Sequence, residues 1–124
     1  MKTGVDMVDV SRFAKISLER DNRLLQRLFR SDETDVFSTP RDLAMAFALK
    51  EAVSKALGTG IASGVQWHDI QVVPRNDGHG VVLHGAAQRL AGQRCFHVSA
   101  DSTDTVAVAL AILEDAHEPE EEGP

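Results

Sequence analysis

The sequence predicts a single domain of the α+β class, in which an N-terminal strand and helices pack on a C-terminal antiparallel sheet. The length of 124 residues suits one domain. Helical spacing of apolar residues is concentrated in residues 11–57, whereas runs rich in β-branched residues dominate residues 67–113. Such a separation of helices and strands is typical of α+β proteins. We assign residues 1–115 to this domain and expect residues 116–124, which are acidic and contain Pro and Gly, to be disordered.

The chain begins with an alternating pattern that predicts a short strand over residues 4–10. Asp6 shares one face of this strand with Val8 and Val10. A helix is then predicted over residues 11–30, because its apolar residues recur at helical spacing and form one stripe.

The next segment predicts a long helix that is apolar on nearly every side. Thr39 supplies its N-cap and Pro40 its first residue, and Gly58 ends the helix just after Leu57. The connector before it, residues 30–39, has room for one short helical turn.

The second half of the chain predicts four strands and a short helix. A turn signal, Asn76-Asp77-Gly78, separates the first two strands, as expected for a hairpin. The predicted strands cover residues 67–74, 81–84, 95–100 and 105–113, and the helix covers residues 85–92.

The composition is that of an ordinary globular protein and excludes several classes. Hydrophobic residues make up 43% of the chain and charged residues 26%. No apolar run approaches the roughly 20 residues of a membrane span, so we expect no membrane partner. The start of the chain lacks the apolar stretch of a secretory signal, and the single Cys95 cannot form an internal disulfide; both favour the cytoplasm. The net charge of −6 argues against nucleic acid as the main partner.

The charge is unevenly distributed along the chain. Residues 11–30 hold six basic and two acidic residues, while residues 61–124 hold three basic and ten acidic ones. This basic strip is either a solvated helix face or a docking surface for an acidic partner, and composition alone does not decide between them. The strip includes Arg12, Lys15, Arg20, Arg23, Arg27 and Arg30.

Two carboxylates occupy unusual positions on apolar faces. Glu51 shares a face of the long predicted helix with Phe47, and Asp6 lies on the apolar face of the first strand. If these two faces pack together, the repulsion between the carboxylates at about 4 Å is on the order of 4 kcal/mol. Three partners can offset it: Lys55 one turn after Glu51, Arg12 near Asp6, or a divalent cation such as Mg²⁺. From the pattern alone, ion pairs are the more frequent explanation.

Four fragments of the sequence occur in an order and with a spacing that are specific in combination. They are "GVDMVDVSRF", "FALKEAVSKALGTGI" followed by "GVQWHDIQV", and "HVSADSTDTVAVALAILE". Over residues 4–114 they resemble the holo-acyl-carrier-protein synthases, the small trimeric class of 4′-phosphopantetheinyl transferases. That family has Gly-x-Asp with Arg six residues later, and then a helix with Lys-Glu-Ala, a further Lys and Gly-Thr-Gly. The matching residues here are Asp6, Arg12, Lys50, Glu51, Ala52, Lys55 and Gly58-Thr59-Gly60.

The resemblance implies transfer of the 4′-phosphopantetheine arm of coenzyme A to a serine of an acyl carrier protein, with release of adenosine 3′,5′-bisphosphate. In the family, the residues matching Asp6 and Glu51 hold Mg²⁺, which also binds the pyrophosphate of coenzyme A. Lys55 would then donate to the phosphates, so Asp6, Glu51 and Lys55 form the expected catalytic set. Glu51 or a water molecule on the metal would take the serine proton, and both remain open. The expected coenzyme A contacts are Lys50, Lys55, Gly58, Thr59, Gly60 and His79.

The resemblance also implies partners. Acyl carrier proteins are acidic, and family members dock them through basic residues of the first helix. The expected docking residues here are Arg12, Lys15, Arg20, Arg23 and Arg27. Family members are trimers with active sites at subunit contacts, so a homotrimer is expected.

Three departures from the family pattern motivate an alternative. Ala46 stands where the family often has Arg, Gly80 where it has Pro, and Ala100-Asp101-Ser102 where many members have His. The alternative is a degenerate relative that docks a carrier protein without transferring anything. A second alternative, which ignores the resemblance, is a small acidic assembly module with two internal ion pairs. Its pairs would be Asp6–Arg12 and Glu51–Lys55.

Overall fold

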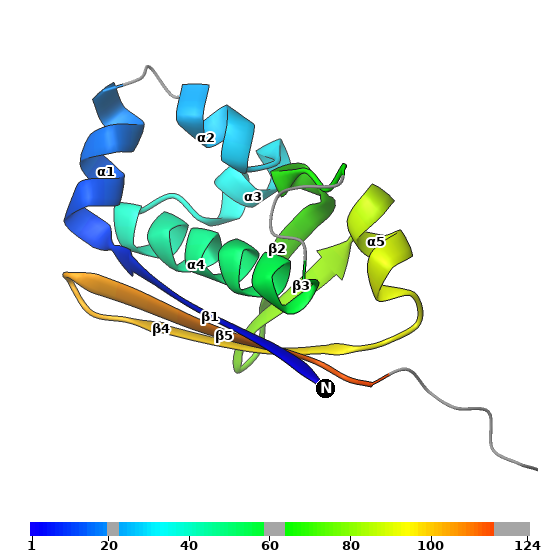
Figure 1. Ribbon diagram of the computed structural model, residues 1–124. Coiled ribbons are helices and arrows are strands. Elements are labelled where there is room, and N and C mark those ends of the chain that lie inside the picture. Colours follow the sequence, from blue (N-terminus) through cyan, green and yellow to red (C-terminus); the bar gives the residue numbers. More distant parts are fainter. Residues whose placement is uncertain (20–22, 59–63, 116–124) are drawn as a thin grey trace, which may run out of the picture.

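The computed structural model describes residues 1–19, 23–58 and 64–115, and it confirms the α+β class (Figure 1). The predicted tail, residues 116–124, lies outside the described residues. None of the helices within the described ranges is long and apolar enough to span a membrane. The elements, in chain order, are β1 (Lys2–Asp9), α1 (Val10–Glu19), α2 (Arg23–Leu28), α3 (Ser31–Val36), α4 (Pro40–Ala56), the 3₁₀ turn η1 (Trp67–Asp69), β2 (Ile70–Arg75), β3 (Gly78–Leu83), α5 (Gly85–Ala91), β4 (Phe96–Ser102) and β5 (Val106–Leu113).

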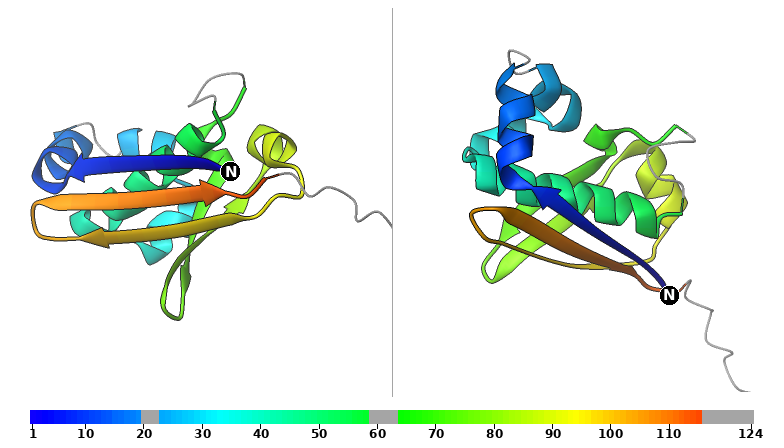
Figure 2. Two further views of the ribbon diagram at one scale, coloured as in Figure 1. Left: turned by 60° about the horizontal axis from the view of Figure 1, so that its bottom comes forward. Right: turned by 60° about the vertical axis from the view of Figure 1, so that its left-hand side comes forward.

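The strands form two antiparallel sheets. The larger has the order β1-β5-β4, and β2 and β3 form a separate hairpin (Figure 2). The first strand of the chain therefore pairs with the last one, with Asp6 opposite Ala109. The prediction of a C-terminal antiparallel sheet is confirmed for β4 and β5, and β1 completes that sheet at one edge.

Helix α4 lies across one face of the three-stranded sheet (Figure 1). The Thr39 hydroxyl accepts a hydrogen bond from the backbone N–H of Asp42 at 3.1 Å, and Gly58 follows the helix with φ +86°, so the predicted start and stop are both confirmed. Where the helix and sheet meet, the buried residues are mostly small, which lets the two backbones approach closely. These alanines are Ala44, Ala48, Ala52 and Ala56 on α4 and Ala107, Ala109 and Ala111 on β5.

Several predicted element boundaries are wrong. Residues 11–30 do not form one helix: α1 and α2 are separate helices, and α2 does not continue the axis of α1 (Figures 1 and 2). Helix α1 starts one residue early, because the Asp9 carboxylate accepts a hydrogen bond from the backbone N–H of Arg12 at 2.9 Å, as an N-cap does. Trp67–Asp69 form a 3₁₀ turn rather than the start of a strand, since the Asp69 carboxylate accepts from the backbone N–H of Gln66.

A buried ion pair joins α3 to α4. Lys50 and Glu33 both have side chains with 0% exposure, and the Lys50 Nζ lies 2.7 Å from Oε1 of Glu33. The ammonium also donates to the backbone carbonyls of Trp67 and Ile70, while the Glu33 carboxylate accepts from the backbone N–H of Val72. Every strong polar group of the pair is therefore satisfied, as a buried charge requires.

Candidate active site

The inward face of β1 carries the first predicted site residue. Gly4, Asp6 and Val8 point toward α4, in agreement with the predicted alternation. The Asp6 side chain is only 13% exposed, and its carboxylate Oδ1 lies 3.0 Å from the Nζ of Lys55, whose side chain is 50% exposed. The Lys55 ammonium also donates to the backbone carbonyl of Val5, so it holds the strand at two points.

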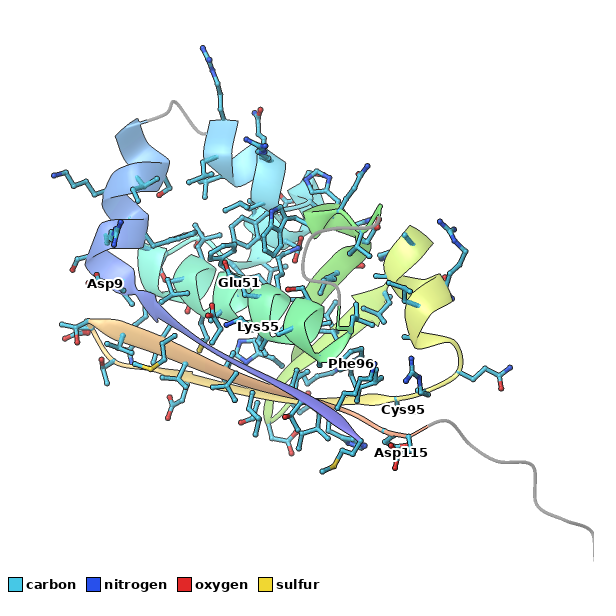
Figure 3. All side chains as sticks on the ribbon, viewed as in Figure 1. Asp9, Glu51, Lys55, Cys95, Phe96 and Asp115 are labelled. Atoms are coloured by element: carbon cyan, nitrogen blue, oxygen red, sulfur yellow. The ribbon has the colours of Figure 1, made fainter. Side chains whose placement is uncertain are left out.

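Glu51 lies one helical turn before Lys55 and faces the same strand (Figure 3). Burial raises the pKa of its carboxyl to about 7, and the charge of Asp6 and a hydrogen bond with the Asp6 side chain add to that shift, whereas Lys55 opposes it. The two apolar faces of the sequence prediction therefore do meet, and they bring the two acids into contact.

The positive charge in this site comes from Lys55 and not from Arg12. The ion pair that Lys55 makes is not the predicted one with Glu51, because the Lys55 ammonium pairs with Asp6. The predicted Asp6–Arg12 pair is wrong: within the described part of the chain Arg12 makes no ion pair, and its backbone is held by Asp9. Two acids thus share a single lysine.

A cavity of about 590 Å³ opens beside the two acids. Phe13, Ile16 and Phe47 form an apolar wall, and Asp9 and Arg12 also line it. The sequence analysis missed Asp9 and the apolar wall as parts of a site. A sequence signal for Asp9 was present, since Asp directly before a helical pattern is a frequent N-cap.

The donor set fits a magnesium ion. Asp6 and Glu51 supply hard carboxylate oxygens, and Mg²⁺ in proteins is usually held by one or two carboxylates together with phosphate oxygens. No cluster of three or more His, Cys, Asp or Glu side chains occurs among the residues that the structure describes, so those residues show no protein cage of the kind that structural zinc requires.

The structure contradicts the prediction that Lys50 binds coenzyme A. Its side chain is completely buried, and its ammonium is occupied by Glu33 and two carbonyls. Burial also lowers the pKa of Lys50. We assign Lys50 to the scaffold. Of the predicted glycine-rich end of α4, Gly58 is exposed, whereas Thr59 and Gly60 lie outside the described residues.

His79 lies apart from Asp6 and Glu51 of its own chain. It belongs to β3, stacks on Phe37 with ring centroids 6.0 Å apart, and lines a second cavity of about 450 Å³ together with Arg75 and Ala100. This cavity borders β4, whereas Asp6 is on β1, and these strands are the two edges of the same sheet. One chain alone does not bring His79 to the acids.

The basic strip is exposed at four of its described residues, whereas Arg30 is half-buried and pairs with Asp32 at 3.2 Å. Arg12, Lys15, Arg23 and Arg27 are all exposed, and Arg12 reaches the rim of the cavity that holds the two acids. Arg20 lies outside the described residues.

Comparison with known proteins shows the family. The pattern of the 4′-phosphopantetheinyl transferase superfamily matches residues 2–111. A holo-[acyl-carrier-protein] synthase of Geobacter metallireducens is 38% identical over 122 residues, which span 90% of this chain and 95% of the relative. The chain therefore belongs to the 4′-phosphopantetheinyl transferase superfamily.

Two solved structures share the fold. The holo-[acyl-carrier-protein] synthase of Helicobacter pylori, in complex with coenzyme A, superposes with a TM-score of 0.83 at 24% identity, over 90% of this chain and 99% of that one. The enzyme of Bacillus anthracis, in complex with CoA (3′,5′-ADP), superposes with a TM-score of 0.77 at 26% identity, over 93% of this chain and 96% of that one. At 24% identity the first of these supports the fold alone.

Proposed function

We propose that this chain is a Mg²⁺-dependent holo-acyl-carrier-protein synthase, which transfers the 4′-phosphopantetheine arm of coenzyme A to a serine of an acyl carrier protein. The observation that carries the proposal is the contact of Asp6 and Glu51 beside Lys55, in a cavity with one apolar wall. The family membership of the chain and the coenzyme A complex of the Bacillus anthracis enzyme support the same reaction.

The reaction is a phosphoryl transfer. The serine oxygen forms a bond to the phosphorus that carries the pantetheine arm, the bond from that phosphorus to the adenosine bisphosphate breaks, and the serine proton goes to a base. Asp6 and Glu51 would hold a Mg²⁺ ion, which would offset their charge and polarise the phosphoryl group. Lys55, half exposed and paired with Asp6, would donate to the phosphates. Glu51 or a water molecule on the metal would take the serine proton.

The carrier protein would dock on the exposed basic strip. Arg12 lies both on the strip and at the rim of the cavity, so a partner on the strip would present its serine close to the two acids. Arg23 and Arg27 extend the positive charge along α2. Charges of this kind act mainly on the rate of encounter and on orientation.

A homotrimer with sites at subunit contacts is part of the proposal. The sheet face opposite α4 exposes large apolar side chains, namely Val5 at 54%, Met7 at 65%, Val108 at 40% and Leu110 at 38%. Figure 2, left, shows this face without a covering helix. Large exposed apolar patches are typical of contacts between proteins. An assembly would also allow the cavity with His79 on one chain to approach the acids of another. The proposed enzyme would act in the cytoplasm, which is the location expected from the sequence.

Intact mass of a carrier protein tests the activity directly. Incubation of the carrier with this chain, coenzyme A and Mg²⁺ should add the mass of the phosphopantetheine arm, and Glu51→Gln should abolish the addition. Asp35→Asn, an exposed acid on α3, is the matched control and should leave it unchanged. Full activity of Glu51→Gln would remove Glu51 from the chemistry.

The degenerate docking module is the alternative, and the departures at Ala46 and Gly80 favour it. In the structure Gly80 leaves room for the Arg75 side chain, whose Nε would lie 2.4 Å from a Cβ at that position. Titration calorimetry separates the two functions. A docking module should bind the carrier but show no Mg²⁺-dependent binding of coenzyme A.

A further inference from the structure

Gly4 lies at a close contact between β1 and α4. It is buried on the inward face of the strand, two residues before Asp6. A Cβ on Gly4 would lie 1.9 Å from the carbonyl oxygen of Ala52 and 3.0 Å from the backbone nitrogen of Ala56. Both atoms belong to the backbone of α4, so no side-chain rotation can relieve the contact. At this point the strand and the helix touch backbone to backbone.

The contact at Gly4 is next to the two acids on both elements. Ala52 directly follows Glu51, and Ala56 directly follows Lys55. Along the strand, Asp6 is only about 6.6 Å from Gly4, since each residue advances about 3.3 Å. The distance between the two backbones at Gly4 therefore limits how far Asp6 lies from Glu51.

We infer that Gly4 is a positioning residue of the candidate magnesium site: its missing side chain sets the separation of β1 and α4 at which Asp6 and Glu51 can hold one ion. The inference rests on the proposed Mg²⁺ site. It assigns to Gly4 a role in geometry rather than in contact with the substrate.

Mg²⁺ binding requires precise placement of its carboxylate ligands, so the effect of Gly4 on that placement can be measured as Mg²⁺ affinity. Moving a new Cβ from 1.9 Å to an ordinary contact of 3.4 Å demands a shift of the strand by about 1.5 Å. Carboxylate oxygens bind Mg²⁺ at about 2.0–2.1 Å in a near-ideal octahedron, so a shift of that size removes one of the two ligands.

The test is a cycle of variants in which Mg²⁺ binding is measured by calorimetry. Gly4→Ala should weaken Mg²⁺ binding at least about tenfold, while circular dichroism remains that of the folded protein. Thr3→Ala, on the exposed opposite face of the same strand, is the matched control and should bind Mg²⁺ as the unchanged protein does. Asp6→Glu, which is one methylene longer, should weaken binding alone but recover part of the lost affinity in the Gly4→Ala background.

Each result decides the question. Unchanged Mg²⁺ affinity in Gly4→Ala, a double variant no better than Gly4→Ala, or a Gly4→Ala protein that does not fold would each overturn the role of Gly4. If the unchanged protein binds no Mg²⁺, the magnesium proposal itself fails. Crystal structures of the unchanged protein and Gly4→Ala then test Gly4 separately, and an equal gap between the side chains of Asp6 and Glu51 would overturn its role.

Discussion

The Lys55 ammonium lies 3.0 Å from the Asp6 carboxylate and thereby joins the last turn of α4 to the edge strand of the sheet. Lys55 also lowers the pKa of Glu51, the second acid of the site. One cation therefore limits the repulsion between two acids that the fold presses together. A single half-exposed ion pair adds little to stability, so the main effect of Lys55 should be on the charge state of Glu51.

Removing the charge of Lys55 should raise the pKa of Glu51 further. In Lys55→Met the burial of Glu51 and the repulsion from Asp6 act without opposition, so the titration midpoint of its carboxyl should move above 7. Carbon-detected NMR of the Glu51 carboxyl in metal-free protein measures this titration midpoint. Lys15→Met, an exposed lysine on α1, is the control. An unchanged midpoint in Lys55→Met would show that Lys55 does not act on Glu51.

The stability of the metal-free protein should depend on pH through Glu51. The folded state raises the pKa of this carboxyl from its ordinary value of 4.5 to about 7. Below pH 4.5 both states hold the proton, and the contribution of Glu51 is fully present. As the pH rises to about 7, the unfolded state ionises first, so this contribution is lost, and above 7 it changes no further. Urea denaturation in EDTA should show this decline in the unchanged protein and not in Glu51→Gln. If the unfolding free energy of both proteins changed with pH in the same way, this prediction would be contradicted.

The buried pair of Lys50 and Glu33 should show strong energetic coupling. Lys50→Met leaves an uncompensated buried carboxylate and should cost about 3–5 kcal/mol of unfolding free energy. Glu33→Leu should cost a similar amount, whereas the double variant should cost clearly less than the sum of the two. Urea denaturation of the four proteins gives the coupling. Additive losses would mean that the two charges do not depend on each other.

Charge reversal on the basic strip should weaken the use of the carrier protein. Replacing Arg23 and Arg27 with Glu should lower kcat/KM for the carrier about tenfold at low salt, with a smaller effect at high salt. The KM for coenzyme A should not change. Arg89→Glu, on the exposed surface of α5, is the control. A loss that does not vary with ionic strength would argue against electrostatic docking.

A charge on the open sheet face should dissociate the assembly. Leu110 is 38% exposed and pairs across the sheet with Val5, so Leu110→Glu would place a carboxylate in the proposed contact. Light scattering after size exclusion should show a monomer, and the activity should fall with it. Val36→Glu changes an apolar residue on α3 that is 51% exposed, and it should preserve the trimer. A trimeric Leu110→Glu would place the subunit contact elsewhere.

Much of the fold was predictable from local patterns. Thr39, Pro40 and Gly58 gave the limits of α4, because caps act on the residues beside them. The break between α1 and α2 was not predictable, since an apolar stripe continues through residues on both sides of it. Periodicity reports which residues are buried and not where the backbone changes direction.

The candidate site was predictable in part for the same reason. Asp6 and Glu51 stood out because each lies on an apolar face, and the structure brings them together. The partner of Lys55 was not predictable: helical spacing favoured Glu51, but the ammonium reaches Asp6 across the contact between helix and strand. The burial of Lys50 was missed because its acid partner, Glu33, is 17 residues away on another helix.

The Lys-Glu-Ala triplet places its two charges in different surroundings, with Lys50 buried in the interior and Glu51 beside the cavity. Under the proposed function the activity depends on Glu51, whereas the folded chain depends on Lys50. A descendant that had abandoned catalysis would thus be free to replace the glutamate while retaining the lysine. A chain that keeps the lysine but lacks the glutamate would therefore have the fold of the family without its activity.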